Sequence, residues 1–479
     1  MSKSKERSRG VSRWWKPVLA LALPFMVGAA CFYSGVGPVD IAPASRDLES
    51  AVAEYRKLGW PLEAKDFDPP VSPSEDGTPT LRLAVAAIGK PYDDASLTKA
   101  INYAKAQKWA EVDKLLKPFD KAFSLAEQAS KYARIRLHVN LDSANLDGAN
   151  YEFVEDLATT GSLINSLCVS ARLRSAEGST DIALKNLTVA WRLSNLIAQQ
   201  PSNELMGMGY ESEVLTAVRR CAAALSHNPE ALTRLDAILN NPCPSYKLEP
   251  LLWSSAYDGI ALSRNLDLYG GMGHLERMVA ASSGAPTTAD ERTDEMVASL
   301  QGKHADPPSP RLTGLPPNML QRAYLDRHLR FWITAAKFSN AHPTDPAAVG
   351  KYIDDLQTKM LNNRSMSDYM EVAIQANFHA TADILLEVEA AYISTKALLS
   401  TLLVCAKTGR MPKTISEIPG TWIDPFTGKP LLVKSSSKGI RVYSVGPNLK
   451  DDGGISQFEN RSLPREYDVA ASYPPVEKL

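Results

Sequence analysis

The chain has 479 residues, of which 44% are hydrophobic and 22% are charged, so it can bury a large core and is too apolar to be disordered as a whole. Its 53 Lys and Arg residues nearly balance its 54 Asp and Glu residues, and the formal net charge is -1. Phosphate binding needs a basic excess on one face, so this balance argues against nucleic acid as a partner. The sequence assembles no recognised catalytic constellation.

The N-terminal segment is predicted to anchor the chain in a membrane. Residues 1–16 carry six Lys and Arg residues against a single Glu, and residues 17–39 contain no charged residue. Because roughly 20 mainly apolar residues span a bilayer as a helix, we expect a transmembrane signal anchor at 17–37. The basic flank and the Trp14-Trp15 pair place residues 1–16 in the cytoplasm. The sequence thus predicts a single-pass protein of the bacterial inner (cytoplasmic) membrane with an extracytoplasmic body.

Two cleavage alternatives compete with a retained anchor. Gly28-Ala29-Ala30 resembles a signal-peptidase site, and together with Cys31 it resembles a bacterial lipoprotein signal, with Gly28 where that signal usually has Leu. All three alternatives export the body into a compartment that permits disulfides. The other cysteines show no CxxC spacing for zinc, and most lie in apolar helical stretches, where Cys is usually a buried hydrophobe. They are Cys168, Cys221, Cys243 and Cys405, of which Cys243 lies in a predicted turn and is the best candidate for an exposed thiol or a disulfide.

The exported body is predicted to be mainly α-helical. A short helix and a Pro-rich linker occupy 38–80, and a helical domain follows over 81–366, with a loose excursion at 284–317. Apolar residues recur there at three-to-four spacing between Pro and Gly turns, which favours an irregular antiparallel helical bundle or a short solenoid without a fixed repeat. Helices are predicted at 47–58, 96–116, 118–140, 151–177, 179–199, 203–226, 229–240, 250–268, 316–341 and 345–362, with Trp191, Trp253 and Trp332 in their core.

The C-terminal region changes character and is predicted to be a small α+β module over 367–470, followed by a tail at 471–479. Apolar residues at helical spacing predict one long helix over 367–408. After Pro412, short β-prone runs at 430–434 and 440–444 alternate with turns. A small antiparallel sheet with one packed face is therefore expected beside the long helix.

Turn motifs recur in a distinctive order in this module. Gly409-Arg-Met-Pro412 is followed by Asp424-Pro-Phe-Thr-Gly-Lys-Pro430, and then by Tyr443-Ser-Val-Gly-Pro-Asn448 and Asp451-Asp-Gly-Gly454. Over residues 390–470 the sequence resembles the C-terminal module of the major pseudopilins of type II secretion. The whole chain resembles uncharacterised bacterial membrane-anchored helical proteins that carry such a module. A filament subunit is not expected, because the anchor has no Glu and more than 300 residues separate it from the module.

The resemblance implies a calcium site, because the C-terminal loop of this class of pseudopilins binds calcium. The matching carboxylates are Asp451, Asp452 and Asp468, with Asn448 and Ser444 as weaker oxygen donors. Calcium prefers six to eight oxygen ligands, which clustered carboxylates help to supply. A solvated acidic turn at the surface is the alternative interpretation.

Two further patterns resemble a catalytic site and a metal site, and each has a simpler structural explanation. Ser96-Leu-Thr-Lys99, Ser367-Asp-Tyr369 and Lys407-Thr-Gly409 imitate the three motifs of penicillin-binding enzymes, but Lys407 ends a predicted helix where that fold needs a strand. His379, Asp383 and Glu387 follow one another at four-residue steps and would share a helix face. A polar stripe opposite the apolar face is the more common origin of such a pattern than a metal site.

These observations favour a non-catalytic, membrane-anchored envelope protein that contacts other envelope proteins, as an adaptor or scaffold related to secretion or pilus-like machinery. The first alternative is an exported enzyme that acts on cell-wall material, which predicts a concave pocket with converging titratable groups. A second alternative is a ligand-binding helical receptor, which predicts a closed apolar cavity.

Overall fold

The computed structural model describes residues 48–67, 69–88, 94–137, 146–200, 203–241, 246–265, 317–363, 378–436, 439–455 and 467–475. It is mainly helical, with a small three-stranded antiparallel sheet near the C-terminus, as predicted at this coarse level. The chain divides into two compact units, which are described one at a time. The following predicted features lie outside the described residues: the anchor at 17–37, Cys31, Cys243, Ser367-Asp-Tyr369 and nearly all of the excursion at 284–317.

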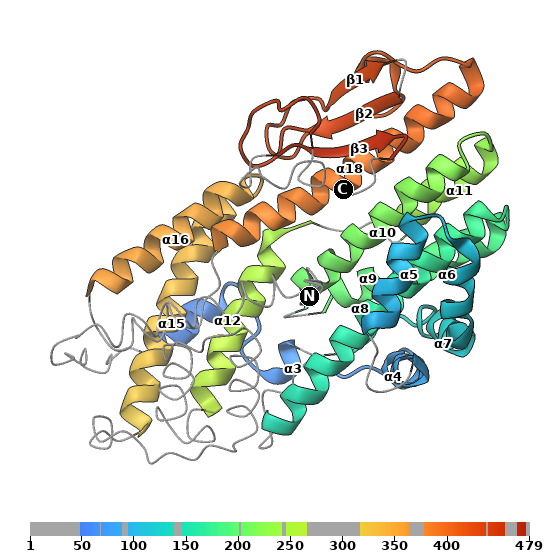
Figure 1. The fold of residues 1–479 in the computed structure, drawn as a ribbon. Coiled ribbons are helices and arrows are strands. Elements are labelled where there is room, and N and C mark those ends of the chain that lie inside the picture. Colours follow the sequence, from blue (N-terminus) through green and yellow to red (C-terminus); the bar gives the residue numbers. More distant parts are fainter. Residues whose placement is uncertain are drawn as a thin grey trace, which may run out of the picture. The chain divides into compact units, whose positions relative to one another are not determined.

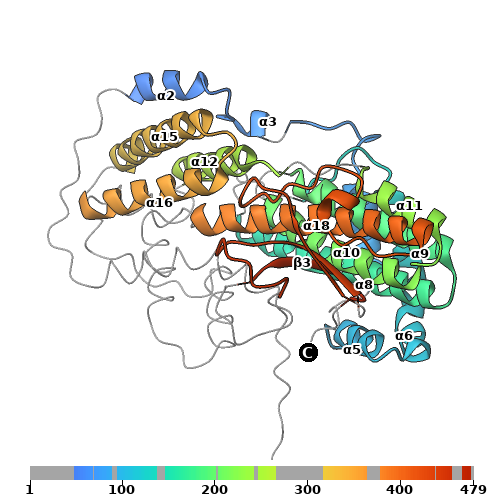
Figure 2. The ribbon, with the colours of Figure 1, turned by 90° about the horizontal axis from the view of Figure 1, so that it is seen from above.

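The first unit comprises residues up to Ala64, 141–147 and 252–381. Its described elements are α2 (Leu48–Arg56), α12 (Leu248–Asn265) after its first turn, α15 (Pro317–Ala341) and α16 (Pro346–Asn363). α2 lies along α15 (Figure 2), and the Lys337 ammonium group is 2.6 Å from the Glu54 carboxylate across this contact. The predicted core position of Trp332 is confirmed, because its ring is fully buried against Phe331 and Phe378.

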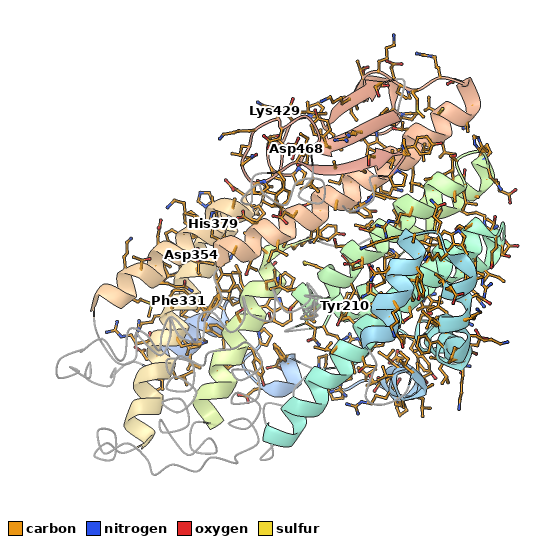
Figure 3. All side chains as sticks on the ribbon, viewed as in Figure 1. Tyr210, Phe331, Asp354, His379, Lys429 and Asp468 are labelled. Carbon is orange, nitrogen blue, oxygen red and sulfur yellow. The ribbon has the colours of Figure 1, made fainter. Side chains whose placement is uncertain are left out.

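Carboxylates fix two helix starts in this unit. Asp345 accepts a hydrogen bond from the Ala348 amide at 2.9 Å, which caps the N-terminus of α16. The half-buried Asp354 on α16 accepts the amides of Phe378 (3.1 Å) and His379 (3.3 Å), and both labelled residues, Asp354 and His379, lie next to each other in Figure 3. Burial raises the pKa of Asp354, and these two amide donors partly offset that effect.

The second unit comprises 65–140, 148–251 and 382–479. It begins with short helices, α3 (Ala64–Phe67), α4 (Thr78–Ile88), α5 (Asp94–Lys105), α6 (Trp109–Leu116) and α7 (Asp120–Ala129). The prediction of a single helix over 96–116 is wrong, because Gln107 adopts a left-handed φ of 54° and separates α5 from α6. The two helices instead fold back on each other and bury Ala104 and Val112 in a shared cluster with Leu173.

Longer helices form the rest of this unit's helical part: α8 (Leu146–Ala176), α9 (Thr180–Ala198), α10 (Glu204–Ala224) and α11 (Pro229–Leu239). α9 and α10 make a tight hairpin, in which Gly207 lies directly against the backbone of Ala198. α10 also packs on α8, where the Tyr210 hydroxyl donates to the Leu157 carbonyl at 2.8 Å. The predicted burial of Trp191 is confirmed, whereas Trp253 on α12 is only partly buried.

The C-terminal module consists of α18 (Phe378–Thr408), which begins in the first unit, and the strands β1 (Leu432–Ser436), β2 (Gly439–Ser444) and β3 (Val469–Tyr473). The strands are antiparallel in the order β1-β2-β3, with Val442 opposite both Val433 and Ala471. The sheet lies along α18 in both views (Figures 1 and 2), and Ala397 of α18 packs with Leu431 and Val442. Residues 471–473, predicted to belong to the tail, are the end of β3.

Among the described residues, one helix, α18, is long and apolar enough to cross a membrane by length and composition. Half of its most apolar window is buried within the protein. Leu385, Leu399 and Leu402 are buried, as expected for the core helix of the module. We therefore interpret the apolar character of α18 as packing.

Candidate functional site

Asp424 organises the loops at one end of the sheet of the C-terminal module. Its buried carboxylate accepts hydrogen bonds from the Ser444 hydroxyl (2.8 Å) and from the amides of Phe426 (2.9 Å) and Val445 (3.1 Å). Three donors satisfy a carboxylate that would otherwise be costly to bury. Ser444, expected as a weak calcium ligand, is thus engaged with Asp424 and is not part of the acidic loop.

The acidic loop, residues 446–455, follows β2 and closes on the start of β3. Gly446 has a φ of 68°, and a Cβ at this position would lie 2.2 Å from the Tyr467 carbonyl oxygen, so only glycine fits this close approach. The Asp468 amide donates to the Ile455 carbonyl at 3.1 Å. The Tyr467 hydroxyl donates to the Glu387 carboxylate of α18 at 3.0 Å, which ties the loop's end to the helix.

The three predicted carboxylates are brought together in this loop. Asp468 is fully buried and accepts the amides of Gly454 (2.6 Å) and Asp452 (3.3 Å). Burial raises the pKa of Asp468 to about 6, with smaller contributions from the negative charges of Asp452 and Asp451, whereas the two amide donors act in the opposite direction. Asp468 is 16 residues from Asp452 in the sequence, and the hydrogen bond between them shows that it lies close to the Asp451-Asp452 pair in the fold.

Each of these carboxylates also has a structural partner within the loop. Asp451 accepts the Tyr443 hydroxyl (3.0 Å) and the Gly453 amide (2.8 Å), and Asp452 accepts the Asn448 side-chain amide (2.8 Å). Two cations from the sheet approach the loop carbonyls, with Arg441 2.9 Å from the Gly454 oxygen and Lys434 3.4 Å from that of Gly453. The loop is thus held by its own acidic side chains, as in a hydrogen-bonded acidic turn.

The three carboxylates are already engaged in hydrogen bonds of the loop. Within the described part of the chain, no group of three or more His, Cys, Asp or Glu side chains is placed to hold a metal ion. Asp451, Asp452 and Asp468 supply charge of the right sign, but their oxygens accept hydrogen bonds from loop donors. Calcium binding at this loop stays a prediction that titration with calcium can test.

The same end of the module exposes apolar side chains. Leu449 is 61% exposed, Ile423 is 41% exposed and Ile455 is 38% exposed. Leu449 also has a positive φ of 58°, which is unfavourable for a residue with a branched apolar side chain. A leucine at this position is therefore favoured neither by the backbone conformation nor by burial of its side chain.

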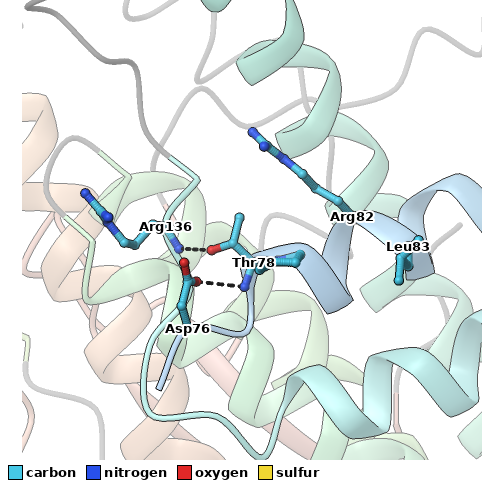
Figure 4. A pocket seen from close by; sticks show the side chains of 6 residues that line it. Asp76, Thr78, Arg82, Leu83 and Arg136 are labelled. Atoms are coloured by element: carbon cyan, nitrogen blue, oxygen red, sulfur yellow. Dashed lines mark hydrogen bonds between the residues drawn. The ribbon is translucent and has the colours of Figure 1, made fainter. Parts of the chain in front are cut away.

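A shallow depression of about 600 Å³ lies elsewhere in the second unit, beside the start of α4 (Figure 4). It is lined by Asp76, Thr78, Arg82, Leu83 and Arg136, together with Pro79. The Asp76 carboxylate accepts the Thr78 amide at 2.9 Å and the Thr78 hydroxyl accepts the Arg136 amide at 2.6 Å, so these groups hold the start of the helix (Figure 4). Asp76, the carboxylate that lines this depression, therefore has a structural role, and the depression does not support the interpretation as an enzyme.

The other sequence patterns have structural explanations. Ser96 and Lys99 lie on α5, and Lys407 lies in the last turn of α18. The third motif of penicillin-binding enzymes lies on a strand, so the helical position of Lys407 does not fit it. His379, Asp383 and Glu387 lie along α18, and none of them belongs to a candidate metal group among the described residues. Cys168 and Cys221 are buried free thiols, as expected for small core residues, and Cys405 is a partly exposed free thiol.

We compared the chain with known protein families, with curated proteins and with solved structures, and none of the three comparisons gives a significant match. The resemblance of residues 390–470 to the pseudopilin module therefore depends on the turn motifs alone. Sequence reasoning also missed two features: the three-donor role of Asp424 and the exposed, left-handed Leu449. The Asp-Pro-Phe turn signalled the first, but no sequence pattern signals the second.

Proposed function

We propose that the chain is a membrane-anchored extracytoplasmic protein whose C-terminal module contacts other proteins of the cell envelope, as an adaptor or scaffold. The observation that carries this proposal is Leu449, which is 61% exposed and held at a positive φ in the acidic loop. An apolar side chain that is exposed and whose residue has an unfavourable backbone conformation is expected where a partner protein buries that side chain. Ile423 and Ile455 add exposed apolar surface to the same module.

Two features of the sequence support the cellular setting. The uncharged run at 17–39 after a basic segment favours a single-pass anchor in the inner membrane, with lipidation at Cys31 as the alternative. The turn motifs over residues 390–470 resemble those of the major pseudopilins, which supports secretion or pilus-like machinery as the partner class.

The test compares two leucines that are equally exposed. Leu449→Asp removes the apolar group at a position whose left-handed backbone aspartate tolerates well. Leu83→Asp, at a residue that is 60% exposed on α4, is the matched control. The full-length chain would be cross-linked in intact cells, purified in detergent, and its partners identified by mass spectrometry.

We expect the wild type and Leu83→Asp to recover the same envelope proteins, including secretion or pilus-like components, and Leu449→Asp to lose most of them. Recovery of the same proteins by Leu449→Asp would contradict the role given to the module. Recovery of cytoplasmic proteins alone by the wild type would contradict the extracytoplasmic location.

A further inference from the structure

Four side chains, of which Glu211 is buried and the other three are partly buried, form what we call the carboxyl cluster, where α18 packs against the helical part of the second unit. Glu211 comes from α10, Tyr246 from the segment that precedes α12, and Glu389 and Tyr392 from α18. The cluster therefore joins three segments that are distant in sequence.

Tyr392 is the main point of attachment within this cluster. Its ring stacks on Trp191 of α9, with centroids 6.1 Å apart and an interplanar angle of 8°, and it is tilted against the ring of Tyr246 at 5.9 Å. Its hydroxyl donates to the Leu239 carbonyl at the end of α11, at 3.3 Å. A change in the position of this one side chain would therefore affect the packing of α18 on both α9 and α11.

Glu211 lies next to Tyr246, and few hydrogen-bond donors are available to stabilise its ionised form. It is 1% exposed, and its Oε2 atom has no hydrogen-bond partner among the described residues. The Tyr246 hydroxyl is its neighbour, but in this geometry the hydroxyl does not complete a hydrogen bond. A buried carboxylate with so few donors is strongly disfavoured, whereas a neutral carboxyl group in the same place is tolerated.

Among the residues that the structure describes, no cation neutralises Glu211. From α18, Glu389 contributes a second acidic group, and Tyr392 contributes a phenol. The cations at this junction are engaged elsewhere, because Lys396 pairs with Asp236 and with the Asn240 side chain at 2.9 Å, and Arg219 donates to the hydroxyls of Thr395 and Thr216. α9 presents the uncharged Trp191.

We propose that Glu211 is a proton-controlled clamp, which in its neutral form packs with Tyr246 beside Tyr392 and on ionisation weakens the attachment of α18 to α9 and α11. Ionisation places a negative charge in a buried site, and opening of the junction gives that charge access to water. The module would be released locally while the remaining helices stay folded. This inference does not depend on the proposed function.

The pH range follows from the same burial. Desolvation raises the pKa of Glu211 to about 8, partly offset by Tyr246, and burial also raises the pKa of Glu389. In the closed junction Glu211 is thus protonated at neutral pH, and in an open, hydrated junction it is ionised. If opening restores an ordinary pKa, the opening constant rises by about tenfold between pH 7 and pH 9, because only the closed form still holds the proton at pH 7.

Hydrogen exchange of the full-length chain in detergent tests this directly. Protection factors, which correct for the pH dependence of the intrinsic exchange rate, would be measured by mass spectrometry for peptides of α18 around Tyr392 at pH 7 and pH 9. Glu211→Gln keeps the size of the side chain and cannot ionise. Glu213→Gln, at an exposed residue of the same helix, is the matched control.

We expect protection of the α18 peptides to fall by about tenfold from pH 7 to pH 9 in the wild type and in Glu213→Gln, and to be independent of pH in Glu211→Gln. An unchanged wild type, or an equal fall in Glu211→Gln, would overturn the clamp. If Glu211→Gln does not fold, the wild-type peptide map decides. Loss confined to α18, α9 and α11 supports the clamp, and an equal loss in α5 and α6 overturns it.

Discussion

Gly207→Ala should destabilise the α9–α10 hairpin, which carries the attachment of the C-terminal module. Gly207 lies against the end of α9, and a Cβ added there would be 2.2 Å from the Ala198 backbone nitrogen and 2.3 Å from its Cα. Both atoms belong to a helix backbone, so no side-chain rotation relieves the contact. The two helices must therefore move apart to admit one methyl group.

The magnitude follows from two opposing effects. Overpacking of a tight interface costs about 1–3 kcal/mol, and a contact between two helix backbones belongs at the upper end of that range. Alanine gains about 1 kcal/mol over glycine in helix propensity. We therefore expect the free energy of unfolding to fall by about 2 kcal/mol.

Urea denaturation of the full-length chain in detergent, followed by circular dichroism, measures this change. Gly178→Ala is the control, because a Cβ at Gly178 meets no atom within 4 Å and that glycine has a φ of 77°. The control should lose about 1 kcal/mol through its backbone conformation alone. A Gly207→Ala protein as stable as the wild type would show that α9 and α10 are not packed in the way described.

Three further outcomes follow from other contacts. Asp424→Asn replaces a carboxylate that accepts three donors, and should lower the free energy of unfolding by about 2 kcal/mol, measured by urea titration; an unchanged midpoint would contradict its organising role. Lys396→Met leaves Asp236 without its cation, and should lower the free energy of unfolding by about 1–2 kcal/mol in the same assay. The Asp236→Asn, Lys396→Met double variant should be no less stable than Lys396→Met alone. If the acidic loop binds calcium, 1 mM calcium raises the Tm of the wild type but not of Asp468→Asn; equal Tm values with calcium and with chelator would remove the calcium prediction.

The helical body could be predicted from the sequence wherever the apolar period was regular. The helix predicted at 179–199 is α9, Thr180–Ala198, with Leu187 and Trp191 fully buried on its packed face. Residues 78–88 were missed because Pro79 follows a Pro-rich stretch that looks like a linker. In the structure Asp76 caps the helix and proline is tolerated in its first turn, where an amide donor is not needed.

The C-terminal sheet could be predicted only in part. Val433 and Val442 lie in β-prone runs that signalled β1 and β2, whereas β3 contains Ala470 and Ala471, whose β propensity is low. β3 is defined by pairing with β2, with Ala471 opposite Val442, and that pairing is a tertiary interaction. Local propensity therefore did not distinguish this strand from a tail.

The candidate sites differ in how visible they are in the sequence. Asp451, Asp452 and Asp468 could be predicted to lie together because the motif order of the module brings that loop back to the sheet. Glu211 gives no such signal, because a single acidic residue in an amphipathic helix is usually exposed, and its burial here results from tertiary packing.

Site-specific photo-cross-linking in intact cells tests the central claim most directly. A photoreactive amino acid would replace Leu449 in the acidic loop and, in a separate variant, the equally exposed Leu83 on α4. We expect position 449 to form covalent adducts with extracytoplasmic envelope proteins and position 83 to form few or none. Adducts of equal yield and identity at the two positions, or none at position 449, would contradict a protein-contact role for the C-terminal module.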